Sequence, residues 1–189
     1  MNFSSINLKW CADLIHTDNS AVGKHNHTFF QTLYIKSGSG LLKINDKSYD
    51  LKEGDFYIFK PLENHEFYAI SDTLNTFESK FDVLDNELYN EICDLNNYIP
   101  VNKNYFERIF SDLVYEYTNG GEYSEYAINS IFTEIIIHLL RLGGKSEIKS
   151  VGENRFLKVI SYIKKHYRED LKLETLAEIM HMEKSYFLR

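Results

Sequence analysis

The sequence predicts an α+β protein in which an antiparallel β-barrel or sandwich is followed by a series of helices. Up to about residue 84, short runs rich in aromatic and β-branched residues alternate with turn signals, the pattern of closely spaced antiparallel strands. Beyond that point, apolar residues recur at every third or fourth position, which indicates amphipathic helices. The change of period places the strands in the first part of the chain and the helices in the second.

The composition is typical of a globular protein. The 189 residues are 43% hydrophobic and 15% aromatic, which suffices to bury a core, and only two are proline. The two cysteines, Cys11 and Cys93, form neither a metal motif nor a disulfide framework. No apolar run reaches the length of about 18 residues that a membrane span needs, and the N-terminus lacks a leader pattern. We therefore expect a cytoplasmic protein with no membrane partner.

The strands define a first domain of residues 1–84. Asn45 and Asp46 stand between two short apolar runs, as in a tight hairpin, and the SGSG stretch at 37–40 is a second turn signal. Strands are expected within residues 28–40, 41–51, 54–60, 65–70 and 74–83.

Helices define a second segment of residues 85–144. They are expected over residues 85–99, closed by Pro100, over 103–120, and over 122–144, which ends at a glycine pair. The apolar face of the last helix is wider than one side of a barrel needs, so we expect part of it to contact a second copy in a homodimer. A fully buried helix in a monomer is the alternative. The residues assigned to the dimer contact are Ile128, Ile131, Ile135 and Leu139.

The stretch HNHTFFQ, residues 25–31, is the first candidate site. Alternate residues of a strand share one face, so His25, His27 and Gln31 are expected to point the same way. A glycine turn at Gly54, a strand and a short loop then deliver His65 to the start of a later strand. Four polar side chains thus converge on one region.

This spacing resembles the cupin family, although the gaps of the second motif are each shifted by one. The resemblance implies an antiparallel barrel over about residues 5–83, with the four polar side chains facing its interior, where cupins can hold a divalent metal. The first cupin motif matches Gly23, His25, His27, Gln31 and Gly38, and the second matches Gly54, Pro61 and His65.

The chemistry of the set permits a metal without requiring one. Neutral imidazoles suit zinc, iron, nickel or copper, but Gln31 carries no charge where cupin enzymes usually have a carboxylate. The sequence therefore favours His25, His27, Gln31 and His65 as the lining of a pocket that hydrogen-bonds a small-molecule effector, without a cofactor. Trp10, Tyr57 and Lys43 are further candidates for the lining. The remaining alternative is that the histidines are satisfied by each other and by water.

The last part of the chain has a different charge balance. From Glu153 onward there are eight basic and six acidic residues, against 13 and 22 before it, so a mildly basic tail follows an acidic body. The polar stretch 145–153 is typical of a linker. Residues 154–189 predict an amphipathic helix, a short helix around LETLAEIM and the start of a third, the order of a helix-turn-helix.

This tail resembles the opening of the AraC-family DNA-binding domain. The turn departs from the family pattern, because His181 and Glu183 stand where the family usually has a glycine and a serine. By the resemblance, Lys184, Ser185, Tyr186 and Arg189 are expected to face DNA. The matching positions are Tyr162, Ile163, His166, Tyr167, Leu173, Leu176, Ala177, Ser185, Tyr186 and Arg189.

The resemblances imply the effector-sensing and dimerisation portion of an AraC-family transcription regulator, which is not an enzyme. An AraC-type domain needs about 100 residues with two helix-turn-helix units, so we expect this tail to be a truncated start, and DNA to be bound only through the complete C-terminal domain. One alternative is a metal-dependent cupin enzyme of the dioxygenase or isomerase type, which leaves residues 154–189 unexplained. Another is a truncated protein that acts only by forming heterodimers with full-length partners.

Overall fold

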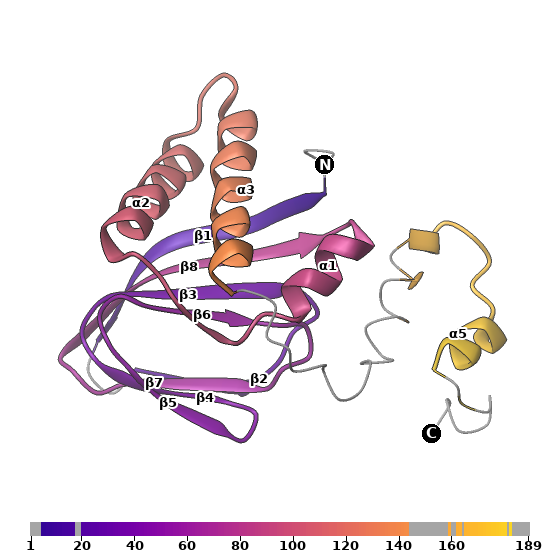
Figure 1. The fold of residues 1–189 in the computed structure, drawn as a ribbon, viewed down its shortest axis with the longest axis horizontal. Coiled ribbons are helices and arrows are strands. Elements are labelled where there is room, and N and C mark those ends of the chain that lie inside the picture. The colour runs from indigo at the N-terminus through magenta and orange to yellow at the C-terminus, as the bar shows by residue number, and fades with distance from the viewer. Residues whose placement is uncertain are drawn as a thin grey trace. The chain divides into compact units, whose positions relative to one another are not determined.

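The computed structural model describes residues 5–17, 20–143, 159, 162–163, 165–180 and 182. The chain divides into two compact units, Met1–Ser146 and Glu147–Arg189. The first unit contains two antiparallel sheets and three helices (Figure 1). The α+β class with antiparallel sheets is therefore confirmed for this unit.

Two sheets form the body of the first unit, and in Figure 1 one lies above the other. The five-stranded sheet has the order β1-β8-β3-β6-β9, and the four-stranded sheet has the order β2-β7-β4-β5. The strands of the first are β1 (Ile6–Thr17), β8 (Thr73–Val83), β3 (Phe30–Ser37), β6 (Asp55–Phe59) and β9 (Tyr98–Pro100). Those of the second are β2 (Ala21–His25), β7 (His65–Ala69), β4 (Gly40–Ile44) and β5 (Lys47–Leu51).

Apolar side chains from both sheets meet between them. Leu33 and Phe59 come from the five-stranded sheet, and Leu42 and Phe67 come from the four-stranded sheet; all four are at most 2% exposed. Burying this much apolar surface on facing sheets is the main force that holds such a barrel closed.

Strand β3 is buried on both faces. Leu33 and Ile35 point into the space between the sheets, whereas Phe30 and Tyr34 belong to a second core on the outer side of the five-stranded sheet. That outer core exists because helices cover this sheet (Figure 1). The helices are α1 (Asn86–Cys93), α2 (Lys103–Asn119) and α3 (Ser124–Gly143).

The helix expected over residues 85–99 is shorter than the pattern indicated. It begins after the N-cap Asp85, whose side chain accepts a hydrogen bond from the Leu88 amide, and it ends at Cys93. Tyr98–Pro100 instead forms the edge strand β9, paired with β6. Pro100 lacks an N–H, and an edge strand is one of the few sheet positions that tolerates this loss.

Two strands, β1 and β2, come before the first strand that the alternation of apolar and polar residues predicted. β1 pairs along its length with β8, and β2 pairs with β7. The expected turns are present: Asn45 and Asp46 form the two-residue connection between β4 and β5, and Asn45 has a φ of 51°. Gly38 has a φ of 91°, and a Cβ there would lie 2.2 Å from the Thr73 carbonyl oxygen, so the SGSG turn requires glycine at this position.

The second unit contains α5 (Leu173–Ile179) and a small apolar cluster in which Val159, Leu176 and Met180 are buried. Ala177 is also buried. The predicted linker 145–153 and the predicted DNA-facing residues Lys184, Ser185, Tyr186 and Arg189 lie outside the described residues. Among the helices that the structure describes, none combines the length and the apolar character needed to cross a bilayer.

Candidate functional site

The stretch HNHTFFQ connects the two sheets. β2 ends at His25 in the four-stranded sheet, and β3 begins at Phe30 in the five-stranded sheet, so residues 26–29 cross between them. The expectation that His25, His27 and Gln31 lie along one strand is therefore wrong. The crossing still brings His27 and Gln31 together, with His27 Nε2 3.1 Å from Gln31 Oε1.

A tight loop before β7 positions His65. The Leu62 amide donates to the His27 carbonyl at 2.7 Å, and the Lys60 amide donates to the Glu63 carboxylate at 2.9 Å. Leu62 has a φ of 67°, a left-handed conformation that is uncommon for a leucine. Such strain persists where surrounding contacts impose it, and it is often found at functional sites. The loop places His65 opposite His25 in the β2–β7 pairing.

The three histidines share one hydrogen-bonding arrangement. The Nδ1 atoms of His25, His27 and His65 lie 2.9, 2.8 and 2.9 Å from the backbone carbonyl oxygens of Gly23, Phe29 and Glu63. A carbonyl oxygen only accepts, so each Nδ1 carries the hydrogen and each neutral ring keeps a lone pair on Nε2. The ring nitrogens available to a ligand all lie within 4.8 Å of one another.

Burial keeps two of these rings neutral. It lowers the pKa of His65 to about 4 and also lowers the pKa of His27, against hydrogen bonds to backbone carbonyls that act in the opposite direction. His65 is 2% exposed, and its Nε2 has no hydrogen-bond partner among the residues that the structure describes. A buried polar atom without a partner costs free energy, so this nitrogen is suited to receive a ligand.

A second polar cluster lies inside the barrel beside the first, and the sequence pattern did not reveal it. Glu78 on β8 is 5% exposed and contacts His16 Nε2 at 3.1 Å, Thr76 Oγ1 at 3.1 Å and Gln31 Nε2 at 3.2 Å. Thr76 and Glu78 alternate with Phe77, which faces the helices. Alternation alone predicts that these polar residues face solvent; here the polar face looks into the barrel because helices cover the other one.

Trp10 lies at the same end of the barrel. It pairs with Lys80 across β1 and β8, and Lys80 pairs with Gln31 across β8 and β3. Lys80 Nζ is 4.8 Å from the centre of the Trp10 ring and 5.9 Å from that of Phe29, which stacks on His27 with ring centres 3.9 Å apart. The positive charge of Lys80 contributes to the lowered pKa values of His27 and His65.

Tyr57 takes a different position. It is buried in the core between the sheets, and its hydroxyl donates to the Asp55 carboxylate at 3.2 Å. Its ring contacts Tyr49 and Tyr98, with centres 5.4 and 5.5 Å apart. The described contacts of Tyr57 thus join it to other tyrosines and an aspartate rather than to the histidines.

The histidine cluster fits a divalent cation. Neutral imidazoles are good ligands for zinc, nickel, copper and iron, and bonds of about 2.1 Å would place the donor atoms about 3.0–3.4 Å apart, so inward movements of about 1 Å are needed. His25, His27 and His65 would hold the ion through Nε2, with Gln31 Oε1 beside them. A bound ion would polarise a coordinated oxygen of a small molecule. The expectation of a pocket without a cofactor stays a prediction.

The predicted dimer residues lie on α3. Ile135 and Leu139 are fully buried against their own chain, so the expectation that these two face a partner is wrong. Ile128 and Ile131 pack against the same core but keep part of their surface exposed. The dimer itself stays a prediction.

Several solved structures of other proteins show low similarity to this chain. A conserved protein of unknown function from Streptococcus pyogenes is 17% identical, with a TM-score of 0.37 and coverage of 40% of this chain and 65% of that chain. Oxalate decarboxylase from Bacillus subtilis is 23% identical, with a TM-score of 0.37 and coverage of 44% and 23%. A predicted oxalate decarboxylase from Thermotoga maritima is 24% identical, with a TM-score of 0.38 and coverage of 41% and 68%. This chain covers less than two thirds of the first two proteins.

Sequence families are more informative. No curated protein sequence matches the chain significantly. The family model described as AraC-like ligand binding domain matches residues 11–127, a span that begins on β1, contains both polar clusters and extends through α2 into the start of α3. This is more than half of the 189 residues. The chain therefore belongs to the family of AraC-like ligand-binding domains.

Proposed function

We propose that this chain is the effector-sensing and dimerisation part of an AraC-type transcription regulator, that it acts in the cytoplasm and that it is not an enzyme. Its membership of a ligand-binding family is the observation that carries the proposal. A small molecule enters the barrel end formed by His25, His27, His65, Gln31 and Lys80. Binding then shifts the protein between two arrangements, to the extent that the ligand prefers one of them.

Strand β3 provides a physical route for this shift. Gln31 faces the polar cluster, and the preceding residue, Phe30, stacks on Phe81 and contacts Tyr89 on the helical side, with ring centres 5.2 and 5.1 Å apart. A ligand that displaces Gln31 therefore also disturbs the packing of the five-stranded sheet against the helices. Packed interfaces of this kind tend to have discrete alternative arrangements.

The charges at the site favour an anionic effector. The rings of His65, which is buried, and His27, which is half-buried, are neutral because burial lowers their pKa values. Glu78 is already surrounded by three partners, and the nearest described contacts of Lys80 are aromatic rings. A small carboxylate with a flat apolar body would pair with Lys80 and lie against Trp10 or Phe29.

Ligand binding can be measured directly. We expect the melting temperature of the 189-residue chain to rise with the concentration of small aromatic or aliphatic carboxylates, because a ligand that binds only the folded state stabilises it. Lys80→Met should abolish the shift. Lys43→Met is the matched control. The expectation that Lys43 lines the barrel is wrong, because it lies on the exposed face of β4 with its Nζ 4.0 Å from Glu66. A series of carboxylates that shifts neither protein, together with neutral ligands that do, would contradict the anionic class but leave the sensing role.

A metal-dependent cupin enzyme is the second candidate, and one observation favours it. Ring nitrogens of three histidines lie within 4.8 Å of one another, and the Nε2 of His65 is buried without a partner among the described residues. The two functions differ in turnover. Metal-loaded protein that consumes a substrate, with activity abolished by His65→Ala, would overturn the sensing role. Binding of a small molecule without chemical change, measured by mass spectrometry of the recovered ligand, would support it.

A further inference from the structure

Glu78 is linked to the histidine cluster through a single side chain. Its Oε2 accepts a hydrogen bond from Gln31 Nε2 at 3.2 Å, and its Oε1 accepts from Thr76 Oγ1 and His16 Nε2, both at 3.1 Å. The other end of the Gln31 amide, Oε1, lies 3.1 Å from His27 Nε2. Gln31 therefore bridges a buried carboxylate and an imidazole nitrogen.

The direction of this bridge is determined by Glu78. Carboxylate oxygens accept hydrogen bonds, so the amide nitrogen of Gln31 must face Glu78. The amide oxygen is then turned toward His27. If the Glu78 carboxylate were absent, the amide could rotate and donate to His27 instead.

This orientation creates an apparent conflict between two acceptors. His27 donates from Nδ1 to the Phe29 carbonyl, so in the neutral ring Nε2 presents a lone pair to the lone pairs of Gln31 Oε1. Two facing acceptors attract only when a positive charge is shared between them. Their separation of 3.1 Å is within the range of about 3.0–3.4 Å expected for two donor atoms bound to one cation at about 2.1 Å each. His65, whose Nε2 has no partner among the described residues, belongs to the same cluster, with its ring centre 4.9 Å from that of His27.

We propose that Glu78 is a positioning residue for a divalent-cation site. It holds the Gln31 amide so that Oε1 joins the Nε2 atoms of His25, His27 and His65 as the fourth donor, and it places a negative charge one hydrogen bond from an ion whose four protein donors are neutral. His16 and Thr76 fix Glu78 in this role. The site is thus a three-nitrogen, one-oxygen set with its counter-charge outside the donors, and the proposal does not depend on the regulator assignment.

The test uses cobalt(II) as the probe and the full 189-residue chain without a histidine tag, stripped with a chelator. The d–d absorption spectrum of bound Co²⁺ depends on which atoms coordinate the ion, and titration calorimetry measures its affinity. We expect one Co²⁺ per wild-type chain. Glu78→Gln should bind about 10–100-fold more weakly, the usual effect of losing a partner of a metal ligand, and its absorption spectrum should change because Gln31 can rotate.

Asp82→Asn is the matched control, because Asp82 is on the same strand and its removal changes the charge equally. Its carboxylate pairs with Lys9 at 2.9 Å. Unchanged Co²⁺ affinity and spectrum are expected. If it weakens binding as much as Glu78→Gln does, the effect is one of overall charge and the proposal is wrong. Failure of the wild-type chain to bind Co²⁺ would overturn it as well.

A charge exchange keeps the proposal testable if Glu78→Gln does not fold. The double variant Gln31→Glu, Glu78→Gln retains a carboxylate–amide pair but moves the carboxylate into the donor position. It should bind Co²⁺ at least as tightly as the wild type, since a charged oxygen is the better ligand. A folded double variant that does not bind Co²⁺, or a Glu78→Gln protein with wild-type affinity and spectrum, would contradict the role of Glu78.

Discussion

Two buried polar groups in the barrel are stabilised to very different extents. Glu78 is surrounded by three hydrogen-bond partners, which compensate the cost of burying a carboxylate. The Nε2 atom of His65 is buried without one. An unpartnered buried polar atom costs about 1–3 kcal/mol. At His65 this cost falls beside two further histidines, which is the arrangement expected where a ligand supplies the missing interaction.

Cys11 allows a prediction at the residue scale. It is 3% exposed, and burial raises the pKa of its thiol to about 12. Because the thiolate is the reactive form, alkylation at pH 8 should be at least about 100-fold slower in the native protein than in urea, and should accelerate as pH rises toward 12. The measurement uses Cys93→Ser, in which Cys11 is the remaining thiol. Rapid native labelling at pH 8 would show that β1 opens readily from β8.

At the scale of elements, α2 is attached to the sheet by stacked aromatic rings. Phe110 is fully buried, and its ring centre lies 6.2 Å from that of Tyr34, 5.7 Å from Phe77 and 6.1 Å from Phe56. These partners come from β3, β8 and β6, so a single side chain couples the helix to three strands. The amphipathic pattern of α2 follows from this one-sided burial.

The consequence is a large difference between two substitutions on one helix. Phe110→Ala should lower the free energy of unfolding by about 3–5 kcal/mol, the usual cost of removing a buried aromatic ring. Tyr115→Ala, at a position 65% exposed, should change it by less than about 0.5 kcal/mol. Urea denaturation followed by circular dichroism measures both. Equal effects would mean that α2 does not pack on the sheet as described.

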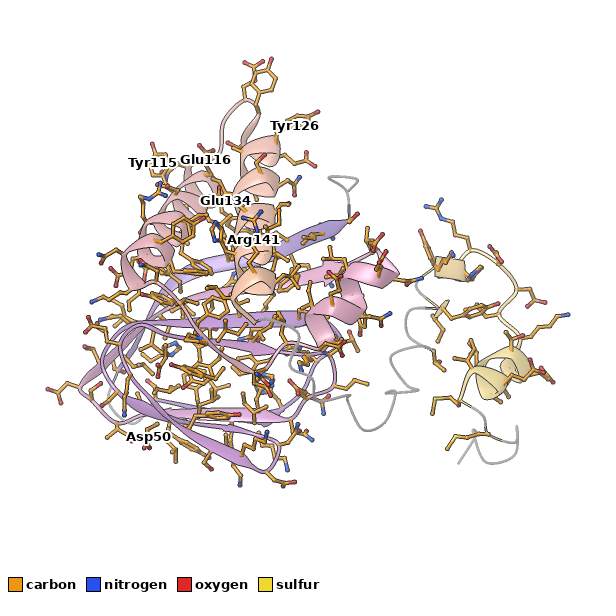
Figure 2. All side chains as sticks on the ribbon, viewed as in Figure 1. Asp50, Tyr115, Glu116, Tyr126, Glu134 and Arg141 are labelled. Atoms are coloured by element: carbon orange, nitrogen blue, oxygen red, sulfur yellow. The ribbon has the colours of Figure 1, made fainter. Side chains whose placement is uncertain are left out.

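At the scale of the whole molecule, the surfaces left exposed on α2 and α3 are unusually aromatic. Tyr115 on α2 and Tyr126 on α3 are 65% and 74% exposed, and their side chains project away from the two helices (Figure 2). Tyrosine is enriched at protein interfaces because its ring is apolar and its hydroxyl can still reach water. These residues, with the exposed parts of Ile128 and Ile131, form the surface on which we expect a second copy to bind.

Sedimentation at micromolar concentration tests the dimer. We expect a species of twice the 22.3 kDa chain mass, and we expect Ile128→Glu combined with Tyr126→Glu to convert it to a monomer that keeps the wild-type circular dichroism spectrum. Tyr68→Glu, at an exposed position on the four-stranded sheet, is the control and should leave the dimer intact. A wild-type chain that sediments only at 22.3 kDa would remove the dimer from the proposal.

DNA binding is expected to require more than residues 1–189. An AraC-type domain reads DNA with two recognition helices about 34 Å apart, and in our proposal residues 154–189 supply at most part of one. With fewer phosphate contacts and an acidic body, the 189-residue chain should not bind a promoter fragment specifically at physiological salt. A chain that carries both complete units should bind it with strong salt dependence. Mobility-shift titrations of both on one fragment decide the matter; specific binding by the shorter chain contradicts the expectation.

Local sequence was sufficient for much of this protein. The alternation in residues 28–83 predicts the strands, because a strand in contact with a core on one side needs apolar residues at every second position. The Asn45–Asp46 turn and the end of α2 before Gly120 depend on a few neighbouring residues, and each was identified correctly. The spacing of His25, His27, Gln31 and His65 also singled out four side chains that the structure brings into one region.

Only the tertiary structure decided what each face of an element contacts. Periodicity separates two faces of β8 but does not say that the polar one looks into the barrel, where Glu78 meets Gln31, a residue 47 positions away in the chain. For the same reason, the apolar stripe of α3 did not show that Ile135 and Leu139 are buried in the core of their own chain. The change of sheet within HNHTFFQ likewise depends on pairing with strands distant in sequence. Local sequence patterns indicate whether a face of an element is polar or apolar, whereas long-range packing determines what that face contacts.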